Sequence, residues 1–277
     1  MDNKIKIIDF NECQTWRMKE DGLGGVRVFA RTEDDEVFVV KPKALNQTLN
    51  EVMAQITLNS LGLTSIEYAF VLIDGIHYGA LRYLDGLTRI YKKDYKFLTK
   101  KQKIEYLKHL FINALFANDD IDGEIYLTKD GNVVSLDYGE AGVCIPLLDI
   151  DKKSDHEKNI ILSMFHKRSE LNNTLSYIRL CVNSACNYYI DDIVNIDDLK
   201  QAIVDVIDGF IDADYSEYET FLKELMALHS ELHAFIYQEH LNGLIEAAEE
   251  LKANLNRLFD DMPAWESGHF LYAKIKF

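Results

Sequence analysis

The hydrophobic pattern of this chain changes character near residue 85. Before that point, short apolar runs such as Val26–Ala30 and Val37–Val40 are separated by turn residues, which is typical of strands. From about Ile160 onward, apolar residues recur at helical spacing, and one stripe contains Leu199, Ile203, Val206 and Phe210. The sequence therefore predicts an α+β fold, with a small antiparallel-sheet lobe at 1–85 and a mainly helical lobe at 86–277.

Local signals place several elements within this outline. Asn50–Leu61 has an approximately helical period, and Gly62 follows where a helix C-cap belongs. Asp74-Gly75 separates two strand-like runs and predicts a hairpin. Thr99–Gln102 matches a capping box, which predicts that a second helix begins there.

Charge and hydropathy exclude some classes of function. The net charge of −16 argues against a general nucleic-acid binder, because affinity for phosphate backbones comes from Lys and Arg. It also disfavours an anionic membrane surface. The N-terminus lacks the apolar core of a signal peptide, and no apolar run approaches the roughly 20 residues that cross a bilayer. We therefore expect a cytoplasmic protein.

The N-terminal residues contain a glycine-rich turn, a lysine at a strand end and a helix carboxylate, which together are the parts that a nucleotide triphosphate site needs. Gly22, Gly24 and Gly25 form a glycine-rich turn between two predicted strands, and backbone N–H groups in such a turn can approach phosphate oxygens. Lys41 ends the next strand, and Glu51 lies near the start of the predicted helix. A lysine at a strand end can contact phosphates, and a helix carboxylate can hold it there.

A second group of residues supplies carboxylates. Asp119 is followed five residues later by Glu124, and Asp137 comes thirteen residues after Glu124, behind a short apolar run. Phosphoryl transfer needs a carboxylate near the attacking hydroxyl and oxygen ligands for magnesium. The spacing predicts a catalytic loop, a short hairpin and a metal-binding loop, with Glu124 and Asp137 as the candidate metal ligands.

Several of these segments resemble the HipA-like family of the protein-kinase-like superfamily. Phe111–Asp120 and Leu136–Glu140 are similar to the family's helix, Asn-x-Asp loop and magnesium-binding aspartate. Val39–Pro42 with Asn50-Glu51 resembles its ATP-lysine strand and helix, and Tyr78–Leu84 resembles its hinge. The resemblance covers roughly residues 15–145 and implies a bilobal protein-kinase-like fold.

The resemblance also implies roles for individual residues. Lys41 would contact the α- and β-phosphates of ATP, Glu51 would pair with Lys41, and Asp137 would hold magnesium. The hinge backbone, including Ala80 and Arg82, would contact adenine.

Two alignments of the catalytic loop remain open. Spacing to the metal-binding residues favours Asp119 as the catalytic aspartate, whereas gapless comparison with the Asn-x-Asp pattern favours Asp120. The family's metal-binding asparagine is absent in both, because Glu124 stands there in the first and Ile125 in the second. A carboxylate can ligate a cation, whereas an isoleucine cannot.

The leading functional hypothesis is an ATP- and Mg-dependent phosphotransferase, a serine/threonine-protein kinase that acts on a protein substrate. A nucleotide-binding pseudokinase that serves as a protein-interaction module is the first alternative, motivated by the missing asparagine. A different nucleotide chemistry on the same fold is the second. An acidic helical interaction protein, in which these spacings are coincidental, is the third.

Overall fold

The computed structural model describes residues 5–19, 26–41, 45–116, 124–136, 138, 196–228, 231–253 and 255–256. The strands are β1 (Lys6–Asp9), β2 (Gln14–Lys19), β3 (Val26–Arg31), β4 (Val37–Lys41), β5 (Tyr68–Ile73), β6 (Ile76–Arg82), β7 (Thr88–Arg89), β8 (Ile125–Leu127) and β9 (Val133–Ser135). The α-helices are α1 (Leu45–Ser60), α2 (Lys100–Leu115), α5 (Ile196–Ile211), α6 (Ser216–Leu228) and α7 (Glu231–Ala253). Two 3-10 helices are η1 (Phe10–Glu12) and η2 (Lys92–Phe97).

The larger sheet has six strands in the order β1-β5-β6-β4-β3-β2. It is mixed, which corrects the expectation of an antiparallel sheet, because β1 runs parallel to β5 while the other neighbours are antiparallel. The parallel strand carries Ile7 and Ile8 and is too short to give a strand signal by itself. Ile8 is buried against the sheet, so tertiary packing recruits this segment as an edge strand.

The larger sheet is strongly curled. Its edge strands β1 and β2 are joined through η1 and Cys13 alone. A flat six-stranded sheet would separate its edges by about 24 Å, whereas this link spans at most about 18 Å. One phenylalanine together with small and β-branched residues fills the concave face, which buries Ile8, Ala30, Phe38, Val40, Ala69, Val71 and Ala80. The short link therefore dictates the curvature.

The opposite face of the sheet packs on α1, which contacts β5 and β6. The C-terminal end of α1 agrees with the sequence, because Gly62 adopts a left-handed φ of 64° and the Leu63 N–H donates to Leu58 O at 3.0 Å. The hairpin of β5 and β6 turns at Asp74 and Gly75, both with positive φ, as expected. The confirmed turn fixes the register of the strand that lies beside Lys41.

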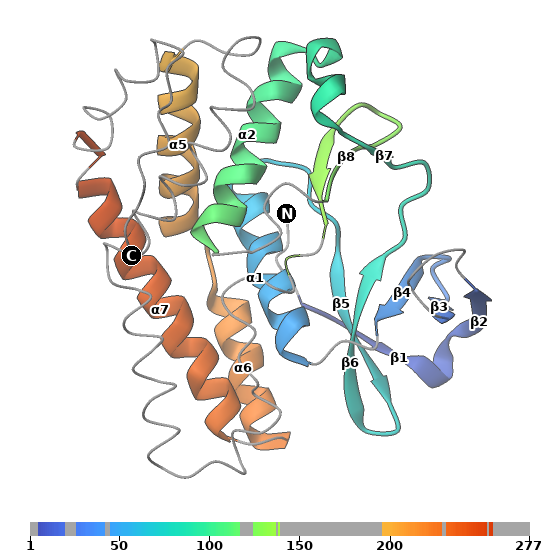
Figure 1. Ribbon diagram of the computed structural model, residues 1–277. Helices are drawn as coiled ribbons and strands as arrows, with labels where there is room; N and C mark the ends of the chain where they lie inside the picture. The colour runs from blue at the N-terminus through green and yellow to red at the C-terminus, as the bar shows by residue number, and fades with distance from the viewer. Residues whose placement is uncertain are drawn as a thin grey trace, which may run out of the picture.

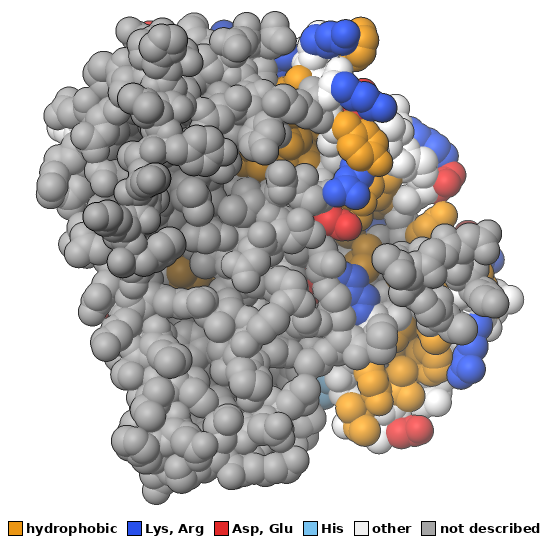
Figure 2. All heavy atoms as spheres, in the orientation of Figure 1, with side chains coloured by type: hydrophobic (Ala, Val, Ile, Leu, Met, Phe, Trp, Pro, Cys, Tyr) orange, Lys and Arg blue, Asp and Glu red, His pale blue; other side chains and the backbone are white. Residues whose placement is uncertain are grey.

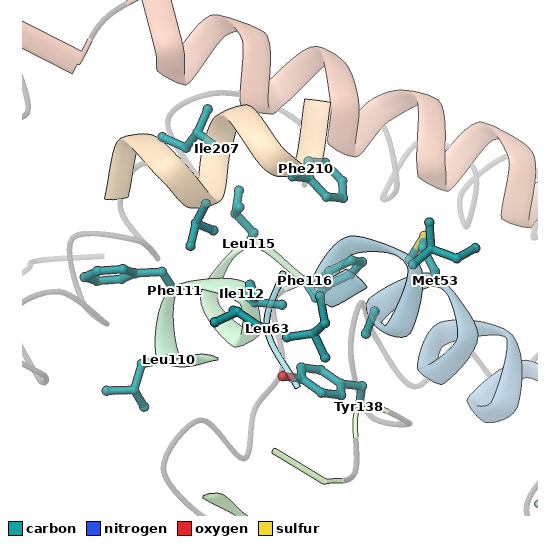
Figure 3. Close-up of a cluster of buried hydrophobic side chains, with 14 of the residues drawn as sticks. Met53, Leu63, Leu110, Phe111, Ile112, Leu115, Phe116, Tyr138, Ile207 and Phe210 are labelled. Atoms are coloured by element: carbon teal, nitrogen blue, oxygen red, sulfur yellow. The ribbon is translucent and has the colours of Figure 1, made fainter. Parts of the chain in front are cut away.

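The main core lies between α1, α2 and α5, and Figure 3 shows its side chains converging from these helices. Helix α2 begins at the predicted capping box, in which Thr99 N–H donates to Gln102 Oε1 and Gln102 N–H donates to Thr99 Oγ1. All four residues of the predicted stripe from Leu199 to Phe210 are buried on α5. Figure 1 shows the curled sheet on one side of α1 and α2, with α5 and α7 on the other.

A smaller sheet has the strand order β7-β8-β9, and Ile125 of β8 and Val133 of β9 are buried in the main core. The hairpin of β8 and β9 matches the two short apolar runs expected between the catalytic and metal-binding loops. Strand β7, which pairs with β8, has no sequence signal because it contains only two residues. None of the helices in the described ranges is long and apolar enough to cross a bilayer.

Candidate functional site

Lys41 and Glu51 meet in an ion pair between β4 and α1. Lys41 Nζ lies 2.6 Å from Glu51 Oε1. The Glu51 side chain is completely buried and the Lys41 side chain is 15% exposed. Lys41 Nζ also lies 5.8 Å from the ring centroid of Tyr68, which is a cation–π distance. The contact brings together two residues that the sequence analysis paired across a strand and a helix.

A glycine on the neighbouring strand lets α1 approach closely enough to form this pair. Gly79 is the register partner of Lys41 on β6. A Cβ atom built on Gly79 would overlap Thr48 Oγ1, and Thr48 is a fully buried residue of α1. The missing side chain therefore sets the distance between helix and sheet, and with it the reach of Glu51 to Lys41.

The helical part of the chain anchors the C-terminal half of α1. A hydrogen bond of 2.8 Å joins the Thr57 and Tyr215 hydroxyl groups, and both residues are buried. Ser60 Oγ donates to Gly209 O on α5 at 2.6 Å. On the sheet, Phe70 packs against Phe221 of α6 with ring centroids 4.7 Å apart. The helical part of the chain therefore contacts both α1 and the sheet.

A row of aromatic and aliphatic side chains lies on the Lys41 face of the sheet. Val39 shares this face because it precedes Lys41 by two residues in the strand. Register pairing connects Trp16 to Phe29, Phe29 to Val39, and Val39 to Leu81. The Trp16 and Phe29 rings stack at 5.2 Å and 9°, and the Tyr83 ring meets Phe29 edge-on at 5.8 Å. The sequence analysis missed this row, because alternation from Lys41 along its own strand identifies only Val39.

The predicted hinge residues Ala80 and Arg82 direct their side chains to the concave face, away from Lys41. Ala80 is completely buried in the concave cluster. Arg82 forms ion pairs with Glu36 and Glu67 at 3.0 and 3.2 Å. The Arg82 N–H donates to Glu67 O, so this backbone donor is already used within the sheet. The structure does not bring these two side chains together with Lys41.

A cavity of about 550 Å³ also opens on the concave side of the sheet. Its lining includes Phe10, Val28, Ile73 and Tyr78, which pack against the concave cluster. Trp16 and Lys41 also line this cavity, and the Lys41 ammonium group bonds to Glu51 of α1. The cavity therefore adjoins the ion pair through Lys41.

The residues flanking Asp137 are held by a buried polar network. His109 of α2 lies 3.3 Å by Nδ1 from the Tyr138 hydroxyl and 3.1 Å by Nε2 from Val133 O. Asn113 Nδ2 donates to Ser135 Oγ at 3.4 Å. On the other side, Leu136 N–H donates to Glu124 O at 2.8 Å. Both chain neighbours of Asp137 are therefore tied to described elements.

Burial keeps the His109 imidazole neutral. Desolvation lowers its pKa from 6.5 to about 4, and the hydrogen bond to Val133 O only partly opposes this effect. Because a carbonyl oxygen can only accept, Nε2 carries the proton and Nδ1 accepts from the Tyr138 hydroxyl. Burial raises the pKa of Tyr138, so this hydroxyl stays protonated and can donate.

Several predicted site residues lie outside the described residues. These are Gly22, Gly24, Gly25, Asp119, Asp120 and Asp137. Glu124 is described, immediately before β8, and its carboxylate accepts a hydrogen bond from Tyr126, whose pKa is raised mainly by burial and further by Glu124. Ile125 is buried in the main core. The relation of the carboxylates to Lys41 stays a prediction.

Comparison with known proteins supports the fold. No protein-family model matches the chain, and no curated protein matches its sequence. Among solved structures, the crystal structure of the Helicobacter pylori proinflammatory kinase CtkA is similar to this chain, with a TM-score of 0.56 and 15% sequence identity. The match covers 91% of this chain and 99% of CtkA. The chain therefore has an α+β fold that resembles a kinase fold.

Proposed function

We propose that this protein is an ATP- and Mg-dependent phosphotransferase, a Ser/Thr protein kinase of HipA-like type. The Lys41–Glu51 ion pair at 2.6 Å carries the proposal. Kinases require this pairing of a strand lysine with a helix glutamate for activity. The likeness in fold to the kinase CtkA supports a kinase-like phosphotransferase, and the HipA-like type rests on the sequence resemblance.

The residues around Lys41 fit a nucleotide. The row of Trp16, Phe29, Val39 and Leu81 offers an apolar, partly aromatic surface for the flat face of adenine. Lys41 lies next to this row and would contact the phosphates, while Glu51 fixes its ammonium group. The N–H groups of Arg82 and Tyr83 bond to Glu67 O and Val37 O. The Gly86 N–H donates to the Asp85 carboxylate. We therefore assign hydrogen bonding to adenine to the segment 84–85.

The carboxylates would act on the phosphates and the acceptor. Asp137 and Glu124 would hold magnesium, which neutralises charge on the transferring phosphoryl group. Asp119 or Asp120 would accept the proton of the attacking Ser or Thr hydroxyl. The described chain neighbours of Asp137 are anchored, because Leu136 N–H donates to Glu124 O and the Tyr138 hydroxyl bonds to His109.

A pseudokinase remains the second candidate function. Glu124 or Ile125 occupies the position of the family's metal-binding asparagine, and the Ile125 side chain is buried in the core. Under this alternative the protein would bind Mg-ATP without transferring phosphate.

One experiment separates the candidates. Thermal stabilisation by Mg-ATP is measured for the wild-type protein and for Lys41→Met, together with autophosphorylation by mass spectrometry and its loss in Asp137→Ala. Stabilisation with a phosphate-sized mass gain supports the kinase, whereas stabilisation alone supports the pseudokinase. A nucleotidyl-sized mass gain would indicate a different nucleotide chemistry. Failure of Mg-ATP to stabilise the wild-type protein would overturn the nucleotide site.

A further inference from the structure

A dense basic segment interrupts this acidic chain between β7 and α2. Residues 89–103 contain seven of the 30 Lys and Arg residues but only one of the 46 acidic residues, Asp94. The local net charge is thus +6 within a chain of net charge −16. Such a concentration of one sign creates a positive potential on a largely negative molecule.

The same segment exposes aromatic rings. Phe97 is 76% exposed and Tyr91 is 52% exposed. Arg89 and Lys93 lie over the Tyr91 ring at 5.6 and 5.5 Å. Lys96 lies over Phe97 at 5.0 Å. We call these five residues the basic-aromatic surface, and Figure 2 shows Lys and Arg side chains beside hydrophobic ones at the upper right.

This surface is held rigidly by its own chain neighbours. Ile90, Tyr95 and Leu98 are buried in the main core, and Tyr95 packs edge-on against Tyr106 of α2 at 4.7 Å. Tyr91 N–H donates to the Asp94 carboxylate at 2.9 Å, and Asp94 N–H donates to Tyr91 O. Because buried residues alternate with exposed ones, the backbone that carries the rings and cations is already ordered before a partner binds.

The chemistry of the surface selects for acidic residues accompanied by an apolar one. Each cation lies over a ring on one side and remains open to a carboxylate on the other. The exposed face of Phe97 can pack against an aliphatic or aromatic side chain. A nucleic acid fits less well, because a long polyanion would extend beyond this segment onto the acidic remainder of the chain.

One end of the surface lies close to Glu124, a proposed metal ligand. Arg89 is the register partner of Tyr126, which lies in β8 two residues after Glu124. We propose that the basic-aromatic surface docks an acidic segment of the protein substrate. This assignment rests on the proposed function, because it names the substrate class of the same site.

Binding of a dye-labelled Glu/Leu peptide tests the docking surface directly, without nucleotide. Fluorescence anisotropy should show weaker binding to Lys96→Glu and, by about tenfold, to Lys93→Glu/Lys96→Glu, because each reversal replaces attraction with repulsion. Phe97→Ala should weaken binding less. Lys223→Glu reverses one charge at an exposed position of α6 and should leave binding unchanged. Binding should also weaken when NaCl is raised from about 50 to about 300 mM.

Three outcomes would overturn the proposal. They are equal binding of a matched Gln/Leu peptide, an equal effect of Lys96→Glu and Lys223→Glu, or tighter binding of a single-stranded oligonucleotide than of the acidic peptide. Concentration-dependent dimerisation that Lys96→Glu abolishes would instead assign the surface to a second copy of the chain.

A kinetic comparison separates this inference from the proposed function. With an acceptor peptide that carries an acidic extension, the wild-type protein should have a lower KM than with the unextended peptide, at similar kcat. Lys93→Glu/Lys96→Glu should remove only this KM advantage. If no phosphate is transferred while the acidic peptide still binds, the proposed function fails and the docking surface stands as a binding site. If transfer occurs without the KM advantage, substrate docking at this surface fails.

Discussion

Two buried polar contacts, Lys41–Glu51 and His109–Tyr138, each join segments that are distant in sequence, but the first is an ion pair and the second is a neutral hydrogen bond. The first joins two charged groups at 2.6 Å, and the lysine retains some solvent contact. The second joins two fully buried neutral groups, because burial lowers the His109 pKa to about 4. A neutral pair is sufficient to fix a backbone, and it avoids the desolvation of charges. Under the proposed function, the charged Lys41–Glu51 pair lies where it would meet the nucleotide. The neutral His109–Tyr138 pair only supports the fold.

Removal of the lysine gives the largest expected effect. Lys41→Met leaves the Glu51 carboxylate buried without its ammonium partner, and we expect a loss of about 3–5 kcal/mol in the free energy of unfolding. Urea denaturation measures this loss. Lys41→Met/Glu51→Leu should recover most of the stability but no stabilisation by Mg-ATP. Equal instability of the single and double variants would mean that the pair does not behave as a buried ion pair.

Lowering the pH should have the second largest effect on the free energy of unfolding, through His109. Between about pH 6.5 and 4 the unfolded chain protonates His109 while the folded protein does not, so stability is lost as pH falls, by about 3 kcal/mol over this range. Urea denaturation at several pH values should show a smaller loss for His109→Gln, which cannot titrate. Parallel pH profiles for the two proteins would contradict a neutral buried imidazole.

Overpacking beside the ion pair should have a moderate effect. Gly79→Ala places a Cβ onto Thr48 Oγ1 and pushes α1 from the sheet, which we expect to cost about 2 kcal/mol. Stabilisation by Mg-ATP should fall as well, because Glu51 moves with the helix. Thr48→Ala removes the overlapping oxygen and should restore both quantities in the double variant. No rescue would show that another contact sets the helix position.

Loss of the hydroxyl that anchors α1 should have the smallest effect. Tyr215→Phe removes the hydrogen bonds of this hydroxyl to Thr57 Oγ1 and to Phe210 O, while Thr57 still donates to Met53 O at 3.1 Å. Because Thr57 keeps a partner, we expect a loss of about 1 kcal/mol. A double-mutant cycle with Thr57→Val measures the coupling directly. Additive effects of the two changes would indicate that this bond contributes nothing.

Several local elements of the fold could be predicted because their signals lie within a few residues. The Asp74-Gly75 turn, the Thr99–Gln102 capping box and the C-cap at Gly62 are each specified by a few adjacent residues. The pairing of Lys41 with Glu51 followed from order along the chain together with a family resemblance. The aromatic row around Phe29 was missed because its members come from separate strands.

The sequence by itself determined the strand and helix periods, the turns and caps, and the order of lysine, helix carboxylate and later aspartates. These features depend on backbone preferences within a few residues. Only the tertiary structure decided that β1 joins the sheet in parallel, that the short link through η1 curls it, and that Gly79 admits α1 to the distance at which Lys41 meets Glu51. Those outcomes depend on chain segments that are distant in sequence, whose packing and excluded volume no local pattern encodes.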